Sequence, residues 1–173
     1  NHDLHPSKVL ERPKVIFNKK TGKFVMWAHV ESADYSKACA GVAVSDSPVG
    51  PFIYQGSFRP NNAMSRDQTV FVDDDGTPWM SWGNGTCFLV KLKPNMTELD
   101  GNIEILKMPK FVEGPWIHKR ENLYYLTYAS MGKGRETISY ATAPSMEGPW
   151  TYRGVLTGMA ENSFTIHPGI IEF

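Results

Sequence analysis

The hydrophobic positions of this chain fall in short runs of β-branched and aromatic residues, which polar turns separate. Such runs are typical of β-strands, and Gly, Asn and Asp at the turns supply the backbone freedom that hairpins need. Amphipathic helical periodicity is hard to find anywhere in the chain. The pattern therefore predicts an all-β protein with three hairpins, formed by residues 15–17 with 24–27, 70–72 with 78–82, and 116–118 with 123–128.

An internal repeat indicates how these hairpins are organised. Residues 43–56 align without a gap on residues 141–154, so that Gly50 matches Gly148 at an offset of 98 residues. Two units of about half that length separate the copies, and a four-stranded propeller blade has this size. Each unit would add a third and a fourth strand to its first hairpin. The predicted fold class is therefore an all-β propeller, with a β-sandwich carrying coincidental hairpins as the alternative.

The predicted domain organisation is a single, partial propeller over residues 1–173. A closed propeller needs about four to eight blades, whereas this chain supplies three first hairpins and one further first strand at residues 170–173. An open arc of blades leaves strand edges unpaired, which invites association. We therefore expect the chain to be part of a larger domain, with the missing blades of the same propeller as its partner. The expected blade-like units are residues 11–66, 67–112 and 113–166, and the next blade starts at 167–173.

Composition and charge narrow the classes of function. Hydrophobic residues make up 41% of the chain and aromatic residues 12%, which is enough for a packed core. The 18 Lys and Arg residues balance the 18 Asp and Glu residues, so no basic surface for a nucleic acid is expected. No apolar run has the length of a membrane span, and no signal peptide is seen. Cys39 and Cys87 are too few and too far apart for a zinc site or a disulfide framework.

Four polar residues stand at equivalent places, at or just before the start of each expected first strand. They are spaced by 56, 46 and 54 residues, about one unit each: Glu11, Asp67, Glu113 and His167. Because first strands line the central channel of a propeller, we expect these side chains to meet at one mouth of that channel. Like charges in a partly desolvated cavity raise the pKa of one carboxyl group, which can then hold a proton near neutral pH.

Glycosidic bond cleavage is the chemistry that suits such a cluster. It needs one carboxylic acid to protonate the leaving oxygen and one carboxylate to attack the sugar or activate water. A third carboxylate can keep the pKa of the acid raised, and the abundant Trp and Tyr suit stacking on sugar faces. The alternative is that these acids cap turns or form surface ion pairs with Arg12, Arg66 and Lys119.

The motifs around these residues resemble glycoside hydrolase family 43. Its third-blade signature is similar to DQTVFVDDDG at 67–76 followed by WMSWG at 79–83, and its fourth-blade signature is similar to EGPWIHKR at 113–120. Residues 162–169 resemble the opening of its fifth blade. The resemblance covers essentially the whole chain, and the ordered set of motifs is specific.

The resemblance implies a five-bladed propeller that hydrolyses polysaccharides containing arabinose, xylose or galactose with inversion. It implies that Glu113 is the general acid and that Asp67 orients this acid and tunes its pKa. His167 matches an axial histidine, which is expected to help bind the substrate and in many relatives lies near a bound calcium or a water cluster. No cofactor is required, and a structural calcium near His167 is the one metal considered. The usual base, an aspartate of the first blade, has no match, because the chain begins at what resembles the second blade.

Different parts of the chain resemble different branches of the family. Residues 11–17, with 45–48 and 65–67, resemble exo-β-1,3-galactanases, in which a glutamate at the Glu11 position joins the site and binds substrate. From about Gly83 onward, the segments resemble β-xylosidases and α-L-arabinofuranosidases. The second match is longer, so xylan or arabinan is the leading expected substrate and β-1,3-galactan the other. The resemblance also implies a secreted or periplasmic enzyme.

Two other functions are compatible with this sequence, and several weaker motifs have a structural explanation. The chain could be a non-catalytic sugar-binding arc, or an incomplete propeller fragment that functions only with other blades. Residues 73–76 are expected to form a hairpin turn rather than a calcium loop, since no glutamate follows at the required spacing. His29 and His118 are expected to be packed or surface histidines, because both lie within strand patterns.

Overall fold

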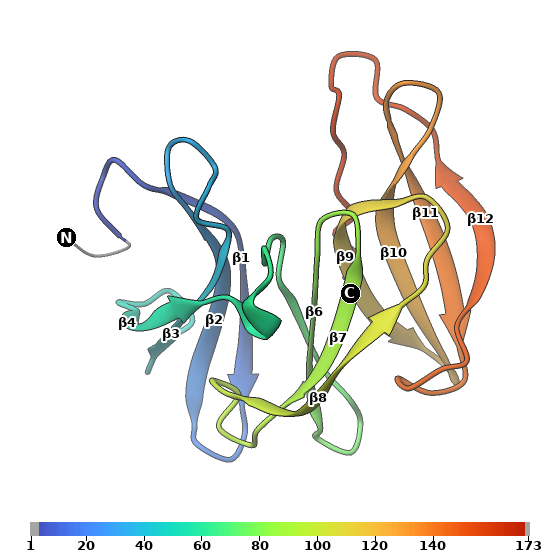
Figure 1. The fold of residues 1–173 in the computed structure, drawn as a ribbon. Helices are drawn as coiled ribbons and strands as arrows, with labels where there is room; N and C mark the ends of the chain where they lie inside the picture. The colour runs from blue at the N-terminus through green and yellow to red at the C-terminus, as the bar shows by residue number, and fades with distance from the viewer. Residues whose placement is uncertain (1–3, 172–173) are drawn as a thin grey trace.

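The protein consists of three antiparallel sheets of four strands each (Figure 1). This structure is a computed structural model, and it describes residues 4–171. In each sheet the strands follow one another in chain order. The first sheet contains β1 (Val9–Asn18), β2 (Lys23–Glu31), β3 (Cys39–Ser45) and β4 (Ile53–Phe58). The second contains β5 (Thr69–Val72), β6 (Pro78–Trp82), β7 (Cys87–Leu92) and β8 (Leu99–Leu106). The third contains β9 (Phe111–Arg120), β10 (Leu123–Met131), β11 (Glu136–Ala143) and β12 (Thr151–Thr157).

This arrangement confirms the predicted all-β class. The three predicted hairpins are the first hairpins of the three sheets, namely β1–β2, β5–β6 and β9–β10. The repeated segments, residues 43–56 and 141–154, both run from the third to the fourth strand, in the first and third sheets. The only helical segment among the described residues is the 3-10 turn η1 (Pro60–Asn62). No helix in residues 4–171 has the length and apolar character to cross a membrane.

The first strands of the sheets lie together at the centre of the molecule. β5 contacts both β1 and β9, while β4 and β12 lie at the outside (Figure 1). Three separate sheets arranged in this way exclude the β-sandwich alternative, in which two sheets would pack face to face. The starts of β1, β5 and β9 therefore converge at one end of the molecule.

Two hydrophobic clusters join neighbouring sheets. One lies between the first and second sheets and contains Trp27 and Trp82, both fully buried. The Trp27 indole Nε1 donates a hydrogen bond of 2.8 Å to the carbonyl oxygen of Met96, so a polar atom in this core is also paired. The other cluster lies between the second and third sheets around Leu126 and Tyr128. Burial of these large side chains gives the three sheets a fixed relative position.

The chain differs from the sequence expectations at two places. β1 begins at Val9 rather than at residue 15, and its pairing with β2 shifts register between Glu11 and Lys14. The strand expected at 170–173 is wrong for residues 170 and 171, which have no strand structure, while 172 and 173 lie outside the described residues. A strand requires a ladder of backbone hydrogen bonds, whereas the Ile170 carbonyl oxygen is paired with the Trp116 side chain at 2.9 Å.

Candidate active site

A cavity of about 420 Å³ opens where the starts of the innermost strands converge. All four residues that the sequence argument selected are among those lining it. The complete lining is Glu11, Arg12, His29, Tyr35, Arg66, Asp67, Glu113, Thr165 and His167. The spacing of one blade places Glu11, Asp67 and Glu113 at the same end of their sheets, and the segment after β12 brings His167 to the same place.

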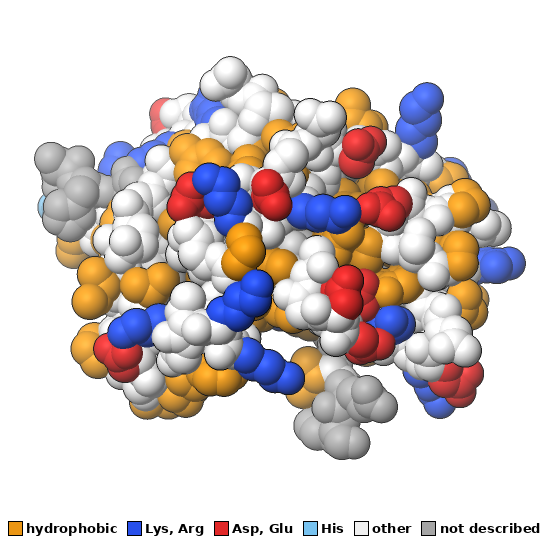
Figure 2. All heavy atoms as spheres, turned by 90° about the horizontal axis from the view of Figure 1, so that it is seen from below, with side chains coloured by type: hydrophobic (Ala, Val, Ile, Leu, Met, Phe, Trp, Pro, Cys, Tyr) orange, Lys and Arg blue, Asp and Glu red, His pale blue; other side chains and the backbone are white. Residues whose placement is uncertain are grey.

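A larger hollow of about 830 Å³ lies near the opposite ends of β1 and β5. Figure 2 shows this side of the molecule, where basic and acidic side chains alternate. Lys119 there pairs with Asp73 and Asp74, with nitrogen–oxygen distances of 3.3 and 2.7 Å. The surface ion pairing considered for Lys119 therefore exists, but it involves the hairpin turn after β5 rather than the residues of the cavity.

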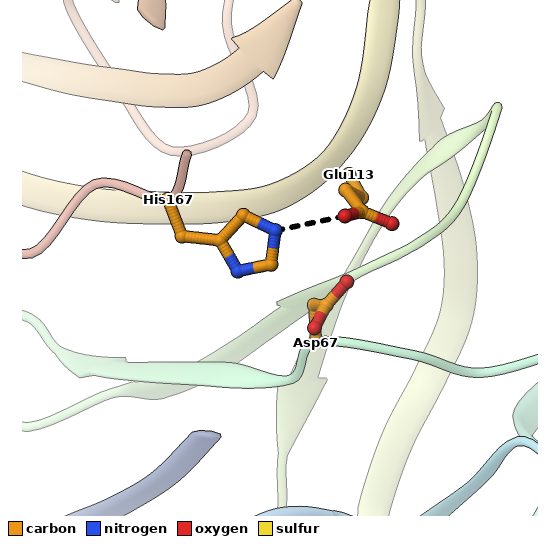
Figure 3. Close-up of side chains that lie close together, drawn as sticks. All are labelled: Asp67, Glu113 and His167. Atoms are coloured by element: carbon orange, nitrogen blue, oxygen red, sulfur yellow. Dashed lines mark hydrogen bonds and ion pairs between the residues drawn. The ribbon is translucent and has the colours of Figure 1, made fainter. Parts of the chain in front are cut away.

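Asp67, Glu113 and His167 form the centre of the cavity (Figure 3). Asp67 lies just before β5, Glu113 lies in β9, and His167 belongs to the segment after β12. His167 Nε2 is 2.9 Å from Glu113 Oε1. The other carboxylate oxygen, Glu113 Oε2, accepts a hydrogen bond of 2.7 Å from Asn84 Nδ2. Both oxygens of Glu113 are thus held in place, and Asn84 is a site residue that the sequence argument missed.

Left-handed backbone conformations shape the local structure of the site. Asp67 has φ +58°, Arg12 has φ +47° and Gly114 has φ +61°. Asp adopts this region more readily than most residues because its short side chain bonds locally, and Gly adopts it without a steric penalty. Gly114 also lies against Arg12 and His167, where a Cβ atom would be 2.5 Å from Arg12 Nη1 and 3.1 Å from the His167 ring.

The electrostatics of the two central carboxyl groups are opposite to the sequence expectation. Burial raises the pKa of Asp67, which is 4% exposed, although His167 and Arg12 act against this rise. The pKa of Glu113 is lowered below its usual value, chiefly by its hydrogen bond with His167, while burial opposes this effect. Neighbouring carboxylates were expected to raise the pKa of the acid. At Glu113 the His167 contact instead outweighs burial and lowers the pKa, so the raised pKa belongs to Asp67.

Arg12 is a cavity residue rather than the surface ion-pair partner considered from sequence. Its guanidinium faces the carboxyl groups of Asp67 and Glu113, and burial lowers its pKa. Arg12 Nη1 is buried, and no described residue accepts a hydrogen bond from it. A buried donor without a partner in the protein is suited to an oxygen of a bound ligand, since such donors are rarely left unpaired.

Glu11 is held at the other side of the cavity by the exposed Tyr35 and the buried His29. Its Oε1 accepts a hydrogen bond of 2.7 Å from the Tyr35 hydroxyl, and its Oε2 is 3.2 Å from His29 Nδ1. His29 Nε2 is in turn 3.2 Å from Glu31 Oε2. His29 is buried, as expected, but it also connects two carboxylates, and Tyr35 was not foreseen. The alternation of a strand could have placed His29 and Glu31 on one face, because they are two residues apart.

The fully buried Glu31 carboxylate anchors this network. It accepts hydrogen bonds from the backbone N–H groups of Ser32, Lys37 and Ala38, at 2.9, 2.6 and 2.8 Å. Burial opposes its ionisation, but these bonds and the contact with His29 lower the pKa of Glu31 overall. Arg66 Nη2 lies 3.6 Å from Glu31 Oε2 and donates to the Tyr35 carbonyl oxygen at 2.6 Å.

The donor set at the centre of the site does not match calcium. Asp67, Glu113 and His167 each offer one ligand atom, all within 4.8 Å of one another. Calcium takes six to eight oxygen ligands, whereas this set has two carboxylates and an imidazole nitrogen. One of the carboxylate oxygens, Glu113 Oε1, already pairs with the imidazole. These three residues therefore do not supply the oxygen ligands of a calcium site.

A propeller whose carboxylates line a cavity at the starts of its innermost strands has the features of a glycoside hydrolase. Residues 15–172 match the family described as glycosyl hydrolases family 43, and the chain belongs to that family. The fold of the exo-β-1,3-galactanase from Phanerochaete chrysosporium, solved with β-1,3-galactotriose, matches 88% of this chain with a TM-score of 0.80 and 32% identity. This agreement confirms the predicted propeller.

Relatives with different named activities are similar to this chain. The arabinoxylan arabinofuranohydrolase of Bacillus subtilis is 30% identical over 82% of this chain. The solved α-L-arabinofuranosidase of Clostridium thermocellum matches 86% of it, with a TM-score of 0.75 and 28% identity. The chain spans 33% of the first of these proteins, 52% of the second and 37% of the Phanerochaete chain. It therefore corresponds to only part of each relative.

Proposed function

We propose that this chain carries the general acid, but not the general base, of an inverting glycoside hydrolase site. The observation that supports this function is the convergence of Asp67, Glu113 and His167 in one cavity, with Glu11 in its wall. Glu113 acts as the general acid that protonates the leaving oxygen, and Asp67 orients it and influences its ionisation. The base that activates water is proposed to lie in the part of the relatives that this chain does not match.

The geometry around Glu113 suggests how its proton is controlled. Asn84 fixes Oε2, so Oε1, which faces His167, is the oxygen that passes the proton. Because the His167 contact lowers the pKa of Glu113, the carboxyl group is ionised at neutral pH when the cavity is empty. A sugar that enters displaces water, and desolvation raises the pKa of a carboxyl group. Substrate binding thus favours the protonated form that the reaction needs.

The substrate that we propose first is β-1,3-linked galactan. Glu11, the residue by which the first part of the chain resembles exo-β-1,3-galactanases, lies in the cavity wall and is held there by Tyr35 and His29. Several solved galactanases of this family are also similar to the chain. Arabinose- or xylose-containing polysaccharides remain the second candidate, favoured by the arabinofuranohydrolase and xylosidase relatives.

Product analysis on three polymers tests this function. We expect the complete propeller, with the base that this chain does not supply, to release galactose from β-1,3-galactan, and to release it with inverted anomeric configuration because water attacks directly. Proton NMR of the first product formed measures this configuration. Arabinose or xylose from arabinoxylan or arabinan would instead establish the second candidate. Sugar binding without any product would support the non-catalytic alternative, and retained configuration would exclude the inverting mechanism.

We propose that hydrolysis requires no metal or cofactor. Treatment with EDTA followed by dialysis is expected to leave the hydrolysis rate and the melting temperature unchanged, because the central residues do not form a calcium cage. A loss of rate that added calcium restores would contradict this expectation.

We also propose that the protein acts outside the cytoplasm. A relative named as an extracellular endo-α-(1→5)-L-arabinanase from Bacillus subtilis, 27% identical over 75% of this chain, supports that location.

A further inference from the structure

The segment that carries His167 lacks the support that strands have. Residues 158–171, which we call the C-terminal strap, follow β12 without any strand structure and are mostly exposed. The strap runs back toward the centre of the molecule beside β9 (Figure 1). His167 nevertheless has to lie within hydrogen-bond distance of Glu113. Its position therefore depends on the few points at which the sheet holds the strap.

Those points come from the third sheet and lie on both sides of His167. Arg135 Nη1 donates to the Glu161 carbonyl oxygen at 2.6 Å. The Glu136 backbone N–H donates to the Phe164 carbonyl oxygen at 3.1 Å. The Glu136 carboxylate then accepts a hydrogen bond of 3.0 Å from the backbone N–H of Ile166. On the far side, Trp116 Nε1 donates to the Ile170 carbonyl oxygen.

Glu136 is the holding point closest to His167, and it is unusual in its surroundings. The residue is 2% exposed, and burial raises the pKa of its carboxyl group. Its one side-chain hydrogen bond among the described residues is the one from Ile166. A buried carboxyl group with a single partner costs stability compared with an apolar residue. Such a group is more easily explained by what it positions than by what it adds to stability.

We propose that Glu136 is a positioning residue, which holds the His167 imidazole against Glu113 by fixing the backbone N–H of Ile166. Ile166 directly precedes His167, so consecutive Cα atoms about 3.8 Å apart transmit the constraint to the imidazole. Without this bond, the strap between Phe164 and Ile170 has no side-chain support on the near side of His167. The effect of Glu136 on catalysis rests on the proposed function of Glu113 as the general acid, whereas its effect on the position of His167 does not.

The first test follows the ring nitrogens of His167 by NMR in the purified chain. Long-range ¹H–¹⁵N spectra, assigned with His167→Asn, report which ring nitrogen carries the proton at one fixed pH. The unmodified chain is expected to show the Nε2 proton fixed by Glu113. Glu136→Ala is expected to shift both nitrogens toward values averaged over two tautomers. Glu136→Gln retains an oxygen acceptor of the same reach, and is expected to restore the original spectrum.

Two further variants keep this test decisive. Ser139→Ala removes the buried hydrogen bond between Ser139 and Ser130 in the same sheet, and neither serine lines the cavity. It is expected to lower the melting temperature without moving the His167 signals. If Glu136→Ala does not fold, Glu136→Asp retains the charge but withdraws the acceptor by about 1.5 Å, one C–C bond, and is expected to give the averaged signals. The proposal would be overturned if the His167 signals stayed unchanged in Glu136→Ala or Glu136→Asp. It would also be overturned if the His167 signals of Glu136→Gln matched those of Glu136→Ala.

The second test separates positioning from stability by kinetics. When Glu136→Ala is introduced into the complete propeller, which supplies the base, kcat is expected to fall by about tenfold with KM unchanged, since misplaced catalytic groups affect the transition state. Glu136→Gln is expected to recover the rate, and Ser139→Ala to retain it. An equal fall in all three variants would mean a purely structural role. NMR signals that behave as proposed, together with a complete propeller that releases no sugar, would support the positioning role and count against the proposed function.

Discussion

Replacement of Glu113 with glutamine in the complete propeller is expected to lower kcat on a natural polysaccharide linkage by about 10²- to 10⁴-fold, the contribution of a general acid. The amide keeps the size of the side chain and can still meet Asn84 and His167. Its N–H groups are not acidic enough to protonate the leaving oxygen, so the loss falls on the chemical step. The rate of sugar release at saturating polysaccharide measures the effect.

Leaving-group dependence and a matched control make this prediction specific. An aryl glycoside whose leaving group needs no protonation should lose much less activity in Glu113→Gln than the polysaccharide does, because the missing proton matters little there. Glu121→Gln makes the same chemical change at an exposed turn of the same sheet and should retain full activity. Equal losses on both substrates would show that Glu113 does not act as the acid.

Replacement of Gly114 with alanine is expected to lower both stability and activity. Gly114 has φ +61°, and the left-handed region costs an L-residue about 1–2 kcal/mol. The new Cβ would also lie 2.5 Å from Arg12 Nη1 and 3.1 Å from the His167 ring, so both side chains would have to move. A displacement of about 1 Å at a catalytic group can reduce activity by about 10²-fold. Thermal unfolding and kcat/KM measure the two effects.

A second glycine separates backbone strain from displacement of the site. Gly101, in β8, has φ +87°, but a Cβ there would meet no atom within 4 Å. Gly101→Ala should therefore lower the melting temperature by a similar strain while leaving kcat/KM unchanged. If Gly114→Ala were to retain its activity, Arg12 and His167 would not need the positions that the structure gives them.

The main lines of the fold were accessible from residue pattern alone. Short runs of β-branched and aromatic residues and the turn residues between them predicted the three first hairpins, because both signals are local. The repeat of residues 43–56 at 141–154 predicted the four-stranded unit, since equivalent positions in equivalent units need similar residues. The same periodicity selected Asp67, Glu113 and His167, which the structure brings together.

Contacts between segments far apart in the chain were not accessible in this way. Asn84 reaches Glu113 across 29 residues and Glu136 reaches Ile166 across 30, and neither pair has a signature in sequence. The strand expected at 170–173 was wrong for its described residues, because strand formation requires a partner strand as well as strand-forming residues.

The amino-acid sequence by itself determined the class of fold, the blade-sized repeat and the residues that stand at the start of each innermost strand. Only the tertiary structure decided the ionisation of those residues. A pKa depends on burial and on neighbours within a few ångströms, and these neighbours come from different sheets and from the strap. For this reason His167 lowers the pKa of Glu113, while burial raises that of Asp67.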